Sequence, residues 1–280
     1  MKEILGAVIV NYNDDNRVIA LVEKILNEGL IDKIAVVDNG SQQESKDKLN
    51  SFFHPYFDKV NLVFNSQNLG FNKATNQGFR LLDRLGCSFV FAINSDVDVS
   101  SEIRMECVKL LLQEPKLALT SCRRMEYGKE KQFYYNFPTI HSEINNDLGI
   151  TKLFHIKPKI REKNENYSLV DFIRFSFVCI RMSALKKVDF LDDHTFLYFG
   201  EARLAKKFLK IGYREAFLNN FTYQHNHIYK KGYKINGYHF TYKESLYYFS
   251  NYTKANQFQL FLLKVAYKCG IAIRKVLRIH

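Results

Sequence analysis

The sequence lacks several features that mark common protein classes. Its five cysteines form no CxxC pair and no even-numbered set, which argues against a disulfide framework and favours a reducing, cytoplasmic compartment. It contains no stretch of about 18 apolar residues, so we expect no membrane-spanning helix. Neither a GxGxxG motif nor a P-loop is present, which leaves dinucleotide or ATP binding without support.

Tryptophan is absent, and acidic residues are outnumbered by basic ones. The chain has 41 Lys and Arg against 29 Asp and Glu, a formal net charge of +12. Such a charge attracts phosphates, whether in a nucleotide, a lipid head group or a nucleic acid. No nucleic-acid-binding motif accompanies the charge, so we expect no nucleic-acid partner. With 280 residues, 46% of them hydrophobic, the chain can bury a core in one large domain or two small ones.

Short apolar runs alternate with helix-period sequence in the first part of the chain. Residues 17–28 place Val18, Leu21 and Val22 on one face, which predicts a helix. Alternating strands and helices predict an α/β fold with a mostly parallel, twisted sheet, because parallel crossovers place helices on both faces. The runs that predict strands lie at 4–10, 34–37, 60–64 and 89–93.

Polar residues follow each of these predicted strands. They are Asn11 to Asn13, Asp38 to Ser41, Asn65 to Asn68, and Asn94 to Asp98. Ligands of parallel sheets bind outside the carboxyl ends of the strands, so this edge is the predicted site. The alternative is that these segments are ordinary polar turns.

Two carboxylates, Asp96 and Asp98, stand directly after the fourth predicted strand. Carboxylates together with substrate phosphates suit Mg²⁺ or Mn²⁺, which prefer oxygen ligands. Such an ion can neutralise a diphosphate leaving group. Alternatively, these acids cap the helix expected near 102–113.

The second half of the chain is less regular. Residues 128–168 predict an extended insertion, 172–181 predict a strand, and 201–211 predict a helix ending at Gly212. We therefore expect a regular α/β first part, a less regular second part and a helical tail. Their expected bounds are 1–122, 123–255 and 256–280.

Four motifs in the first half resemble glycosyltransferase family two, in order and approximate spacing. They are Val10-Asn11-Tyr12-Asn13, Val36 to Ser41, Asn68-Leu69-Gly70-Phe71 continuing to Asn76-Gln77-Gly78, and Ile93-Asn94-Ser95-Asp96. Segments Phe175 to Phe177 with Ile180-Arg181, Phe190 to Asp193, Phe196 to Phe199 and Leu204 to Tyr213 resemble the acceptor half of its bacterial polysaccharide branch, which includes rhamnosyltransferases. The resemblance runs from about residue 4 to residue 255, and it implies that 1–122 is the nucleotide-sugar-binding half and 123–255 the acceptor-binding half.

This resemblance implies a GT-A fold, a nucleoside diphosphate sugar donor and a divalent metal, Mg²⁺ or Mn²⁺. By it, Asp38 contacts the base and Asp96 meets the ribose or the metal. The donor-binding residues that it implies are Asn11, Asp38, Asn68, Gly70, Asn76, Asn94 and Asp96. Because Asn94 occupies the family's first acidic position, metal ligation can rest on Asp96 with the diphosphate, and Asp98 lies one step beyond the usual pair.

Inverting transfer requires a carboxylate that removes the proton of the acceptor hydroxyl, and Glu201 is the candidate. It matches the second residue of the family's acidic pair, at a helix start that favours an anion. Gly200 and Arg203 depart from the family's acids on either side of it. Glu201 can also be an ordinary first-turn acid, and Asp192 with Asp193 forms a reserve pair that is otherwise a structural turn.

Two histidines, His225 and His227, match a position where relatives often carry histidine near the donor diphosphate or metal. His225 is the favoured metal ligand. The alternative is that both are structural.

No Asp or Glu follows Glu244. From Gln257 on, a helix gathers basic residues within an arc of about 120°, namely Lys264, Lys268, Arg274, Lys275 and Arg278. This pattern predicts a helix at an anionic membrane surface or, alternatively, a solvated basic face.

We therefore expect hexosyl or deoxyhexosyl transfer from a UDP- or dTDP-sugar to a saccharide hydroxyl, on a growing lipid-linked surface polysaccharide. The alternative function is that of a catalytically degenerate, sugar-nucleotide-binding partner of another transferase.

Overall fold

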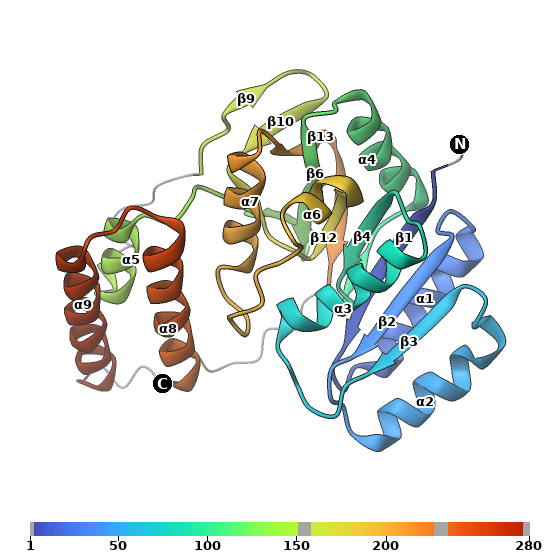
Figure 1. Cartoon of the computed structure of the whole chain (residues 1–280), viewed down its shortest axis with the longest axis horizontal. Helices are drawn as coiled ribbons and strands as arrows, with labels where there is room; N and C mark the ends of the chain where they lie inside the picture. Colours follow the sequence, from blue (N-terminus) through green and yellow to red (C-terminus); the bar gives the residue numbers. More distant parts are fainter. Residues whose placement is uncertain (1–2, 151–157, 227–234, 277–280) are drawn as a thin grey trace. The chain divides into compact units, whose positions relative to one another are not determined.

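A computed structural model describes residues 3–150, 158–226 and 235–276 (Figure 1). The chain forms two compact units. Unit 1 comprises Met1–Tyr135 and Ile160–His227, and unit 2 comprises Asn136–Lys159 and Ile228–His280. The sequence-based segments were consecutive, whereas here residues 136–159, the middle of the predicted insertion, belong to the same unit as the tail.

A single large sheet organises unit 1, in the strand order β3-β2-β1-β4-β12-β6-β13-β10-β9. The first four strands of the chain sequence pair in parallel, as the apolar runs predicted. They are β1 (Leu5–Asn11), β2 (Lys33–Asp38), β3 (Val60–Phe64) and β4 (Phe89–Ile93). The carboxyl ends of β1 to β4 therefore share one edge of the sheet.

The other strands extend this sheet beyond β4. Strand β12 (Phe177–Arg181) runs antiparallel between β4 and β6 (Leu117–Glu126), and β13 (Arg214–His225) runs parallel to β6. Short strands complete the set: β5 (Val97–Asp98), β7 (Lys129–Lys131), β8 (Tyr134–Tyr135), β9 (Glu162–Lys163), β10 (Tyr167–Val170) and β11 (Phe172–Ile173).

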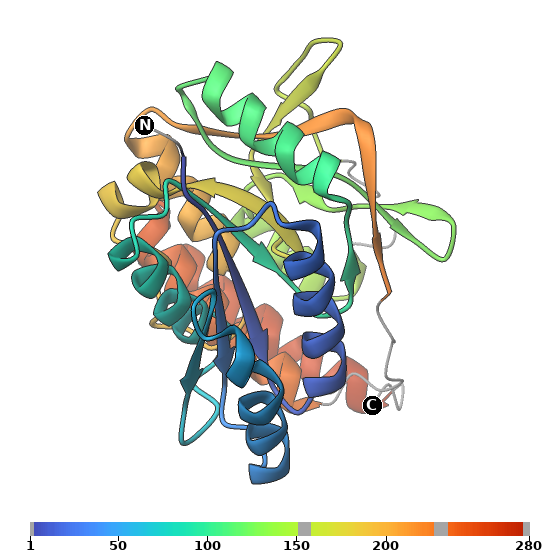
Figure 2. The same cartoon turned by 90° about the vertical axis from the view of Figure 1, so that its right-hand side faces the viewer.

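Helices cover both faces of the sheet. A hydrophobic cluster lies between the sheet and the helices on each face. Ala7 and Ile9 of β1 face one cluster, whereas Val8 between them faces the other, as alternation along a strand requires. Figure 2 shows α1 and α3 on opposite sides of the strands. The first cluster includes α1 (Asp15–Glu28), α2 (Gln43–Phe53) and α4 (Ser101–Gln113), and the second includes α3 (Phe71–Arg84), α6 (Met182–Lys187) and α7 (Gly200–Lys210). A 3-10 turn, η1 (His54–Tyr56), follows α2. The predicted α/β fold is confirmed.

Two local features differ from the sequence-based expectations. The strand predicted over 172–181 is interrupted, since β11 ends at Ile173 and β12 begins at Phe177. The cap of α4 is Ser100, whose Oγ accepts from the backbone N–H of Ile103 at 3.3 Å. Asp98 is thus not needed as a helix cap, while the predicted end of α7 is confirmed by Gly212, which has a φ of +84°.

Unit 2 contains α5 (Ile140–Asp147), α8 (Ile235–Tyr252) and α9 (Gln257–Val276). Its interior is aromatic: the rings of Tyr242 and Tyr267 stack with centroids 3.7 Å apart. Gly270 allows α5 and α9 to approach closely, since a Cβ there would lie 2.2 Å from the carbonyl oxygen of Asp147. Among the described residues, no helix is long and apolar enough to cross a membrane.

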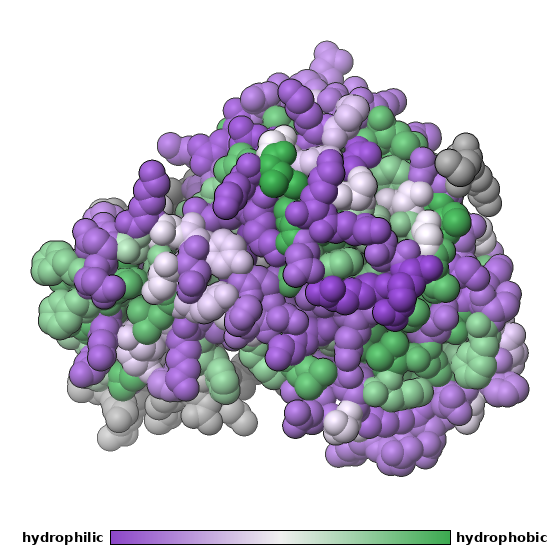
Figure 3. Space-filling view, in the orientation of Figure 1, coloured by the Kyte–Doolittle hydropathy of each residue, from purple (hydrophilic) through white to green (hydrophobic). Residues whose placement is uncertain are grey.

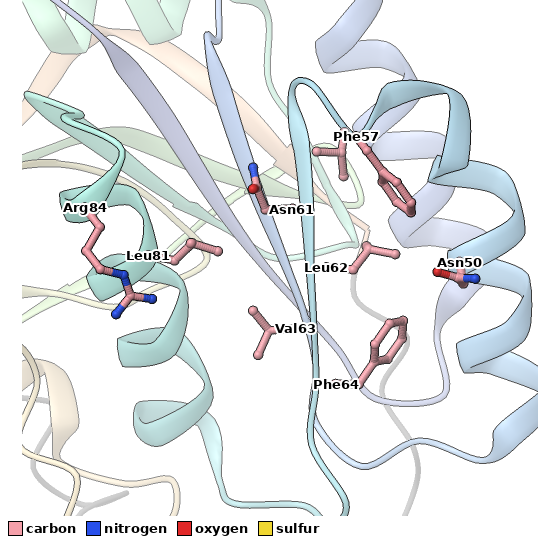
Figure 4. A pocket seen from close by; sticks show the side chains of 9 residues that line it. Asn50, Phe57, Asn61, Leu62, Val63, Phe64, Leu81 and Arg84 are labelled. Atoms are coloured by element: carbon pink, nitrogen blue, oxygen red, sulfur yellow. The ribbon is translucent and has the colours of Figure 1, made fainter.

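A hollow of about 460 Å³ lies at the free edge of the sheet, on β3 (Figure 4). Its lining residues come from α2, β3 and α3 and from the turn before β3: Asn50, Phe57, Val60, Asn61, Leu62, Val63, Phe64, Leu81 and Arg84. None of the site residues predicted from the sequence lines it. The chemistry is therefore better sought at the strand ends.

Candidate active site

Asn11 and Asp38 form the floor of the strand-end edge. Both are almost fully buried, and the Asn11 Nδ2 group donates to Asp38 Oδ2 at 2.8 Å. The backbone N–H of Ser41 donates to Asp38 Oδ1 at 3.0 Å. Both carboxylate oxygens of Asp38 are therefore oriented by neighbours, which fixes the end of β2 against the end of β1.

A network of amides builds the loop before α3. Asn39 Nδ2 donates to Asn68 Oδ1 at 2.9 Å, and Asn39 Oδ1 accepts from the backbone N–H of Leu69 at 3.0 Å. Gly70 adopts a φ of +87°, and a Cβ there would lie 2.5 Å from the carbonyl oxygen of Phe196. The loop thus needs glycine at this position. Asn39 holds the loop through these hydrogen bonds, a role that its position after β2 did not predict.

Asn76 has a different set of contacts from the predicted one. Its side-chain amide exchanges two hydrogen bonds with the backbone of Leu191, at 2.8 and 3.0 Å. Asn72, one turn earlier, donates to the carbonyl oxygen of Asp192 at 3.1 Å. Asn76 therefore holds the 191–192 segment against α3, and its role in donor binding stays a prediction.

Asp96 and His225 come together at the end of β4. Asp96 Oδ1 lies 3.2 Å from His225 Nε2, and His225 Nδ1 lies 2.8 Å from Glu126 Oε1. All three side chains are largely buried, with Glu126 1% exposed. Burial lowers the pKa of His225, but the hydrogen bonds to Asp96 and Glu126 outweigh it and raise the pKa overall.

This arrangement fits a divalent cation. The adjacent Asp96 Oδ1 and His225 Nε2 atoms can bind one ion, while Glu126 holds the other ring nitrogen of the histidine, as carboxylates do beside metal-ligating histidines. Within the described residues, no group of three or more His, Cys, Asp or Glu is arranged for metal binding. An ion there would take its remaining ligands from substrate phosphates and water.

The other two metal candidates stand apart from this pair. The Asp98 carboxylate is exposed and forms an ion pair with Lys24 of α1. His227 lies outside the described residues. Glu126 had no role in the sequence analysis, because nothing in the local pattern of β6 signals that its side chain meets a histidine of β13.

We call the edge formed by Asn11, Asp38, Asn68 to Gly70 and Asp96 the donor edge, because the family resemblance predicts that it binds the donor. The interruption between β11 and β12 connects it to Glu201. The backbone N–H of Asn94 donates to the carbonyl oxygen of Ser176 at 2.9 Å, and the N–H of Phe175 donates to Glu201 Oε1 over a long 3.5 Å. Glu201 therefore stands close to the end of β4, although 107 positions separate it from Asn94 in the sequence.

Gly200 and Arg203, which depart from the family's acids, have packing roles here. A Cβ at Gly200 would lie 2.5 Å from Asn72 Oδ1, so no larger side chain fits without displacing that amide. Arg203 is fully buried, donates to the carbonyl oxygen of Asp192 at 3.1 Å and lies 3.6 Å from its carboxylate. His194 contacts the same carboxylate at 2.9 Å. Asp192 therefore serves to hold its own loop.

Comparison with known protein families decides the assignment. The model of glycosyl transferase family 2 matches residues 7–189. The chain belongs to glycosyl transferase family 2. The family match ends before Glu201, Arg203 and His225, so the roles of these residues rest on geometry.

One curated relative in sequence is the low-salt glycan biosynthesis hexosyltransferase Agl10 of Haloferax volcanii. It is 23% identical over 202 residues, which are 72% of this chain and 60% of that protein. The chain thus covers less than two thirds of that relative.

Solved structures with similar folds include the mannosyltransferase PcManGT of Pyrobaculum calidifontis, in complex with GDP-Man and Mn²⁺. It superposes with a TM-score of 0.63 at 12% identity, over 99% of this chain and 75% of that one. GalNAc-T7 with UDP, GalNAc and Mn²⁺ gives a TM-score of 0.61 at 10% identity, over 99% and 58%. The GT-A fold expected from the motifs is confirmed.

Proposed function

We propose that this family 2 chain transfers a sugar from a nucleoside diphosphate sugar to an acceptor hydroxyl, with inversion at the anomeric carbon. The observation that carries the proposal is the meeting of Asp96 with His225 beside the Asn94–Ser176 and Phe175–Glu201 contacts. These contacts bring a cation-binding pair and a candidate base to the same end of the sheet.

The donor edge binds and orients the nucleotide. Asp38 receives the base, Asn11 fixes that carboxylate, and the Asn68 to Gly70 loop lines the nucleotide pocket together with Asn94. Asp96 and His225 hold a divalent cation, Mg²⁺ or Mn²⁺, which when bound neutralises the charge that develops on the diphosphate leaving group. Both solved neighbours carry Mn²⁺ in their complexes, which supports the choice of a divalent ion.

Glu201 acts as the general base. As the acceptor oxygen bonds to the anomeric carbon, the bond from that carbon to the diphosphate oxygen breaks, and Glu201 takes the acceptor proton. The nucleoside diphosphate leaves with the bonding electrons. Glu201 stands in the first turn of α7.

We propose a hexosyl or deoxyhexosyl unit, rhamnosyl among them, carried by UDP or dTDP. The acceptor is a sugar hydroxyl of a growing, lipid-linked bacterial surface polysaccharide. The hexosyltransferase name of the Haloferax relative and the sequence resemblance to the polysaccharide branch support this choice. Such an acceptor requires work at the cytoplasmic, anionic face of a membrane.

A thermal-shift screen of UDP- and dTDP-sugars, with and without Mn²⁺, tests donor binding. A ligand at 100 times its Kd stabilises the folded chain by about 2.7 kcal/mol. Asp96→Asn should lose the Mn²⁺-dependent part of the shift, whereas Asp98→Asn, the matched neighbour, should keep it. The absence of any donor-dependent shift in the wild type would refute the proposal, and donor binding without transfer to any saccharide would favour the degenerate partner instead.

A further inference from the structure

The outward face of α9 is apolar over most of its length. Exposed large hydrophobic side chains occur along it from the first turn almost to the last: Phe258 (67% exposed), Phe261 (59%), Leu262 (39%), Val265 (40%) and Ile273 (40%). At 100° per residue these positions fall within an arc of about 120° on one side of the helix, and the buried Leu263 and Tyr267 lie on the other side. A soluble surface rarely carries so continuous an apolar stripe, so this face needs a partner.

Lysines border this stripe on one side. Lys264 and Lys268 are both exposed, and on the helical wheel they lie next to Phe261. Arg274, expected among the basic residues, instead turns inward, where its Nη1 donates to the carbonyl oxygen of Asp147 at 2.9 Å. Its guanidinium also stacks over the ring of Tyr238, 4.0 Å from the centroid. The basic face is therefore narrower than predicted, and its described part is confined to the border of the apolar stripe.

The charges around the stripe select an anionic occupant. No acidic residue follows Glu244, so α9 has no carboxylate that would repel phosphate. A second copy of the chain would instead bring the lysines of two α9 helices together. Phenylalanines flanked by lysines are the arrangement of helices that lie in the plane of a bilayer, with rings among the acyl chains and ammonium groups at the phosphates.

We propose that α9 docks the chain on an anionic lipid surface, with Phe258, Phe261, Leu262 and Val265 inserted and Lys264 and Lys268 at the head groups. Figure 3 shows hydrophobic side chains at the outer side of this helix. The inference rests on the proposed work at a membrane but not on catalysis. Lipid binding and sugar transfer can therefore fail separately.

The absence of tryptophan makes a direct test possible. Phe261→Trp introduces a single indole, whose emission should shift to the blue on adding phosphatidylcholine vesicles with about one third phosphatidylglycerol. Brominated lipids should quench it. Phe57→Trp, at an exposed phenylalanine of unit 1, is the control and should show neither effect. The same shift in both variants, or in neither, would overturn the proposal.

Sedimentation of the full chain with vesicles separates the contribution of the phenylalanines to lipid binding from that of the lysines. Phe258→Ser with Phe261→Ser should weaken binding at least about tenfold. Lys264→Gln with Lys268→Gln should weaken it by about fivefold per lysine, with loss of the preference for anionic lipid. The exposed pair Lys116→Gln with Lys129→Gln has the same net charge and should bind almost as the wild type does.

Two further outcomes count against the inference. A blue shift of Phe261→Trp that grows with protein concentration in the absence of vesicles would mean that a second copy covers the face. An equal loss of vesicle binding in the Lys264/Lys268 variant and the Lys116/Lys129 variant would mean that only the net charge attracts the chain to the lipid. The donor-dependent thermal shift in solution should be unchanged in all these variants, and its absence from the wild type would refute the proposed function while leaving lipid docking intact.

Discussion

The donor edge and the acceptor side of unit 1 are built in different ways. The donor edge consists of side chains at the ends of consecutive parallel strands, such as Asn11 and Asp38, which bond to each other. The acceptor side, which we define as residues 174–203, depends on an interrupted strand and a loop held by a buried ion pair. One is fixed by sheet topology, the other by contacts between distant segments.

This difference determines how each side tolerates change. A substitution at the donor edge should leave the parallel sheet in place and change only the contacts proposed for the donor. A substitution on the acceptor side should also disturb the loop that precedes α7, because Asn72 and Arg203 donate to Asp192 and Asn76 donates to Leu191. The predictions below separate these two kinds of effect.

Glu201→Gln should have the largest effect. Loss of a general base typically costs about 10²- to 10⁴-fold in rate, while the donor edge is untouched. We expect that loss in kcat, with the donor affinity unchanged in thermal-shift titration. Glu102→Gln, at a first-turn glutamate of α4, is the matched control and should retain full activity.

A Glu201→Gln enzyme as fast as the wild type would remove this residue from the mechanism. It would also leave the two sides of the site without a functional connection.

Arg203→Met should act on the acceptor side through stability. Breaking one partner of a buried ion pair costs about 3–5 kcal/mol, because the other charge stays buried. Urea unfolding should show that loss, and the donor Kd of the folded fraction should stay near its wild-type value while the acceptor KM rises. Arg84→Met, at an exposed arginine, serves as the control.

Arg203→Lys tests the same contact if the methionine variant does not fold. It keeps the charge but not the fork of donors, so an intermediate loss is expected. Wild-type stability in both variants would show that the ion pair with Asp192 does not hold the loop.

Glu126→Ala should weaken metal binding by about 10- to 100-fold, the usual effect of removing an outer partner of a ligating histidine. Glu126→Gln keeps a hydrogen-bond acceptor for the ring N–H of His225. Its metal affinity should therefore lie between that of Glu126→Ala and that of the wild type. The affinity of the chain for Mn²⁺ in the presence of UDP can be measured from the electron paramagnetic resonance spectrum of the free ion. Glu130→Gln, an exposed acid on the same hairpin, should bind as the wild type does; a matching loss there would point to general electrostatics.

Much of the donor edge was predictable from the sequence, because strand periodicity and strand-end residues are local signals. The positions of Asp38 and Asp96 followed from counting strands. The contacts of Asn76 were not predictable in this way. Its side-chain amide bonds to the backbone of Leu191, which is distant in the sequence.

The rest of the site carries few local signals. Glu126 and His225 lie on different strands, and only the pairing of β6 with β13 brings them within 2.8 Å. The break between β11 and β12 was also missed, because residues 172–181 are apolar enough for one strand. Contacts of this kind depend on tertiary packing, which overrides local pattern.

Glu215→Gln should have the smallest effect, one visible in the dependence of stability on pH. Burial raises the pKa of Glu215 well above its ordinary value, and the nearby Glu201 and Asp171 carboxylates raise it further, although the backbone N–H of Ile173 donates to it. The native chain therefore keeps this proton after the unfolded chain has released it. The stabilisation is complete below the unfolded pKa, near 4.3, and is lost as the pH rises toward the native pKa.

The wild type should consequently lose up to about 1.4 kcal/mol per pH unit above that point through this group. In Glu215→Gln this contribution disappears, so its unfolding free energy should fall less between pH 5 and pH 8, as measured by urea titration at each pH. Glu162→Gln, at an exposed acid, should follow the wild type. If the unfolding free energy of Glu215→Gln depends on pH as that of the wild type does, Glu215 is ionised in the native chain. Unit 1 would then hold a buried carboxylate charge near Glu201, with the backbone N–H of Ile173 as a hydrogen-bond donor to it.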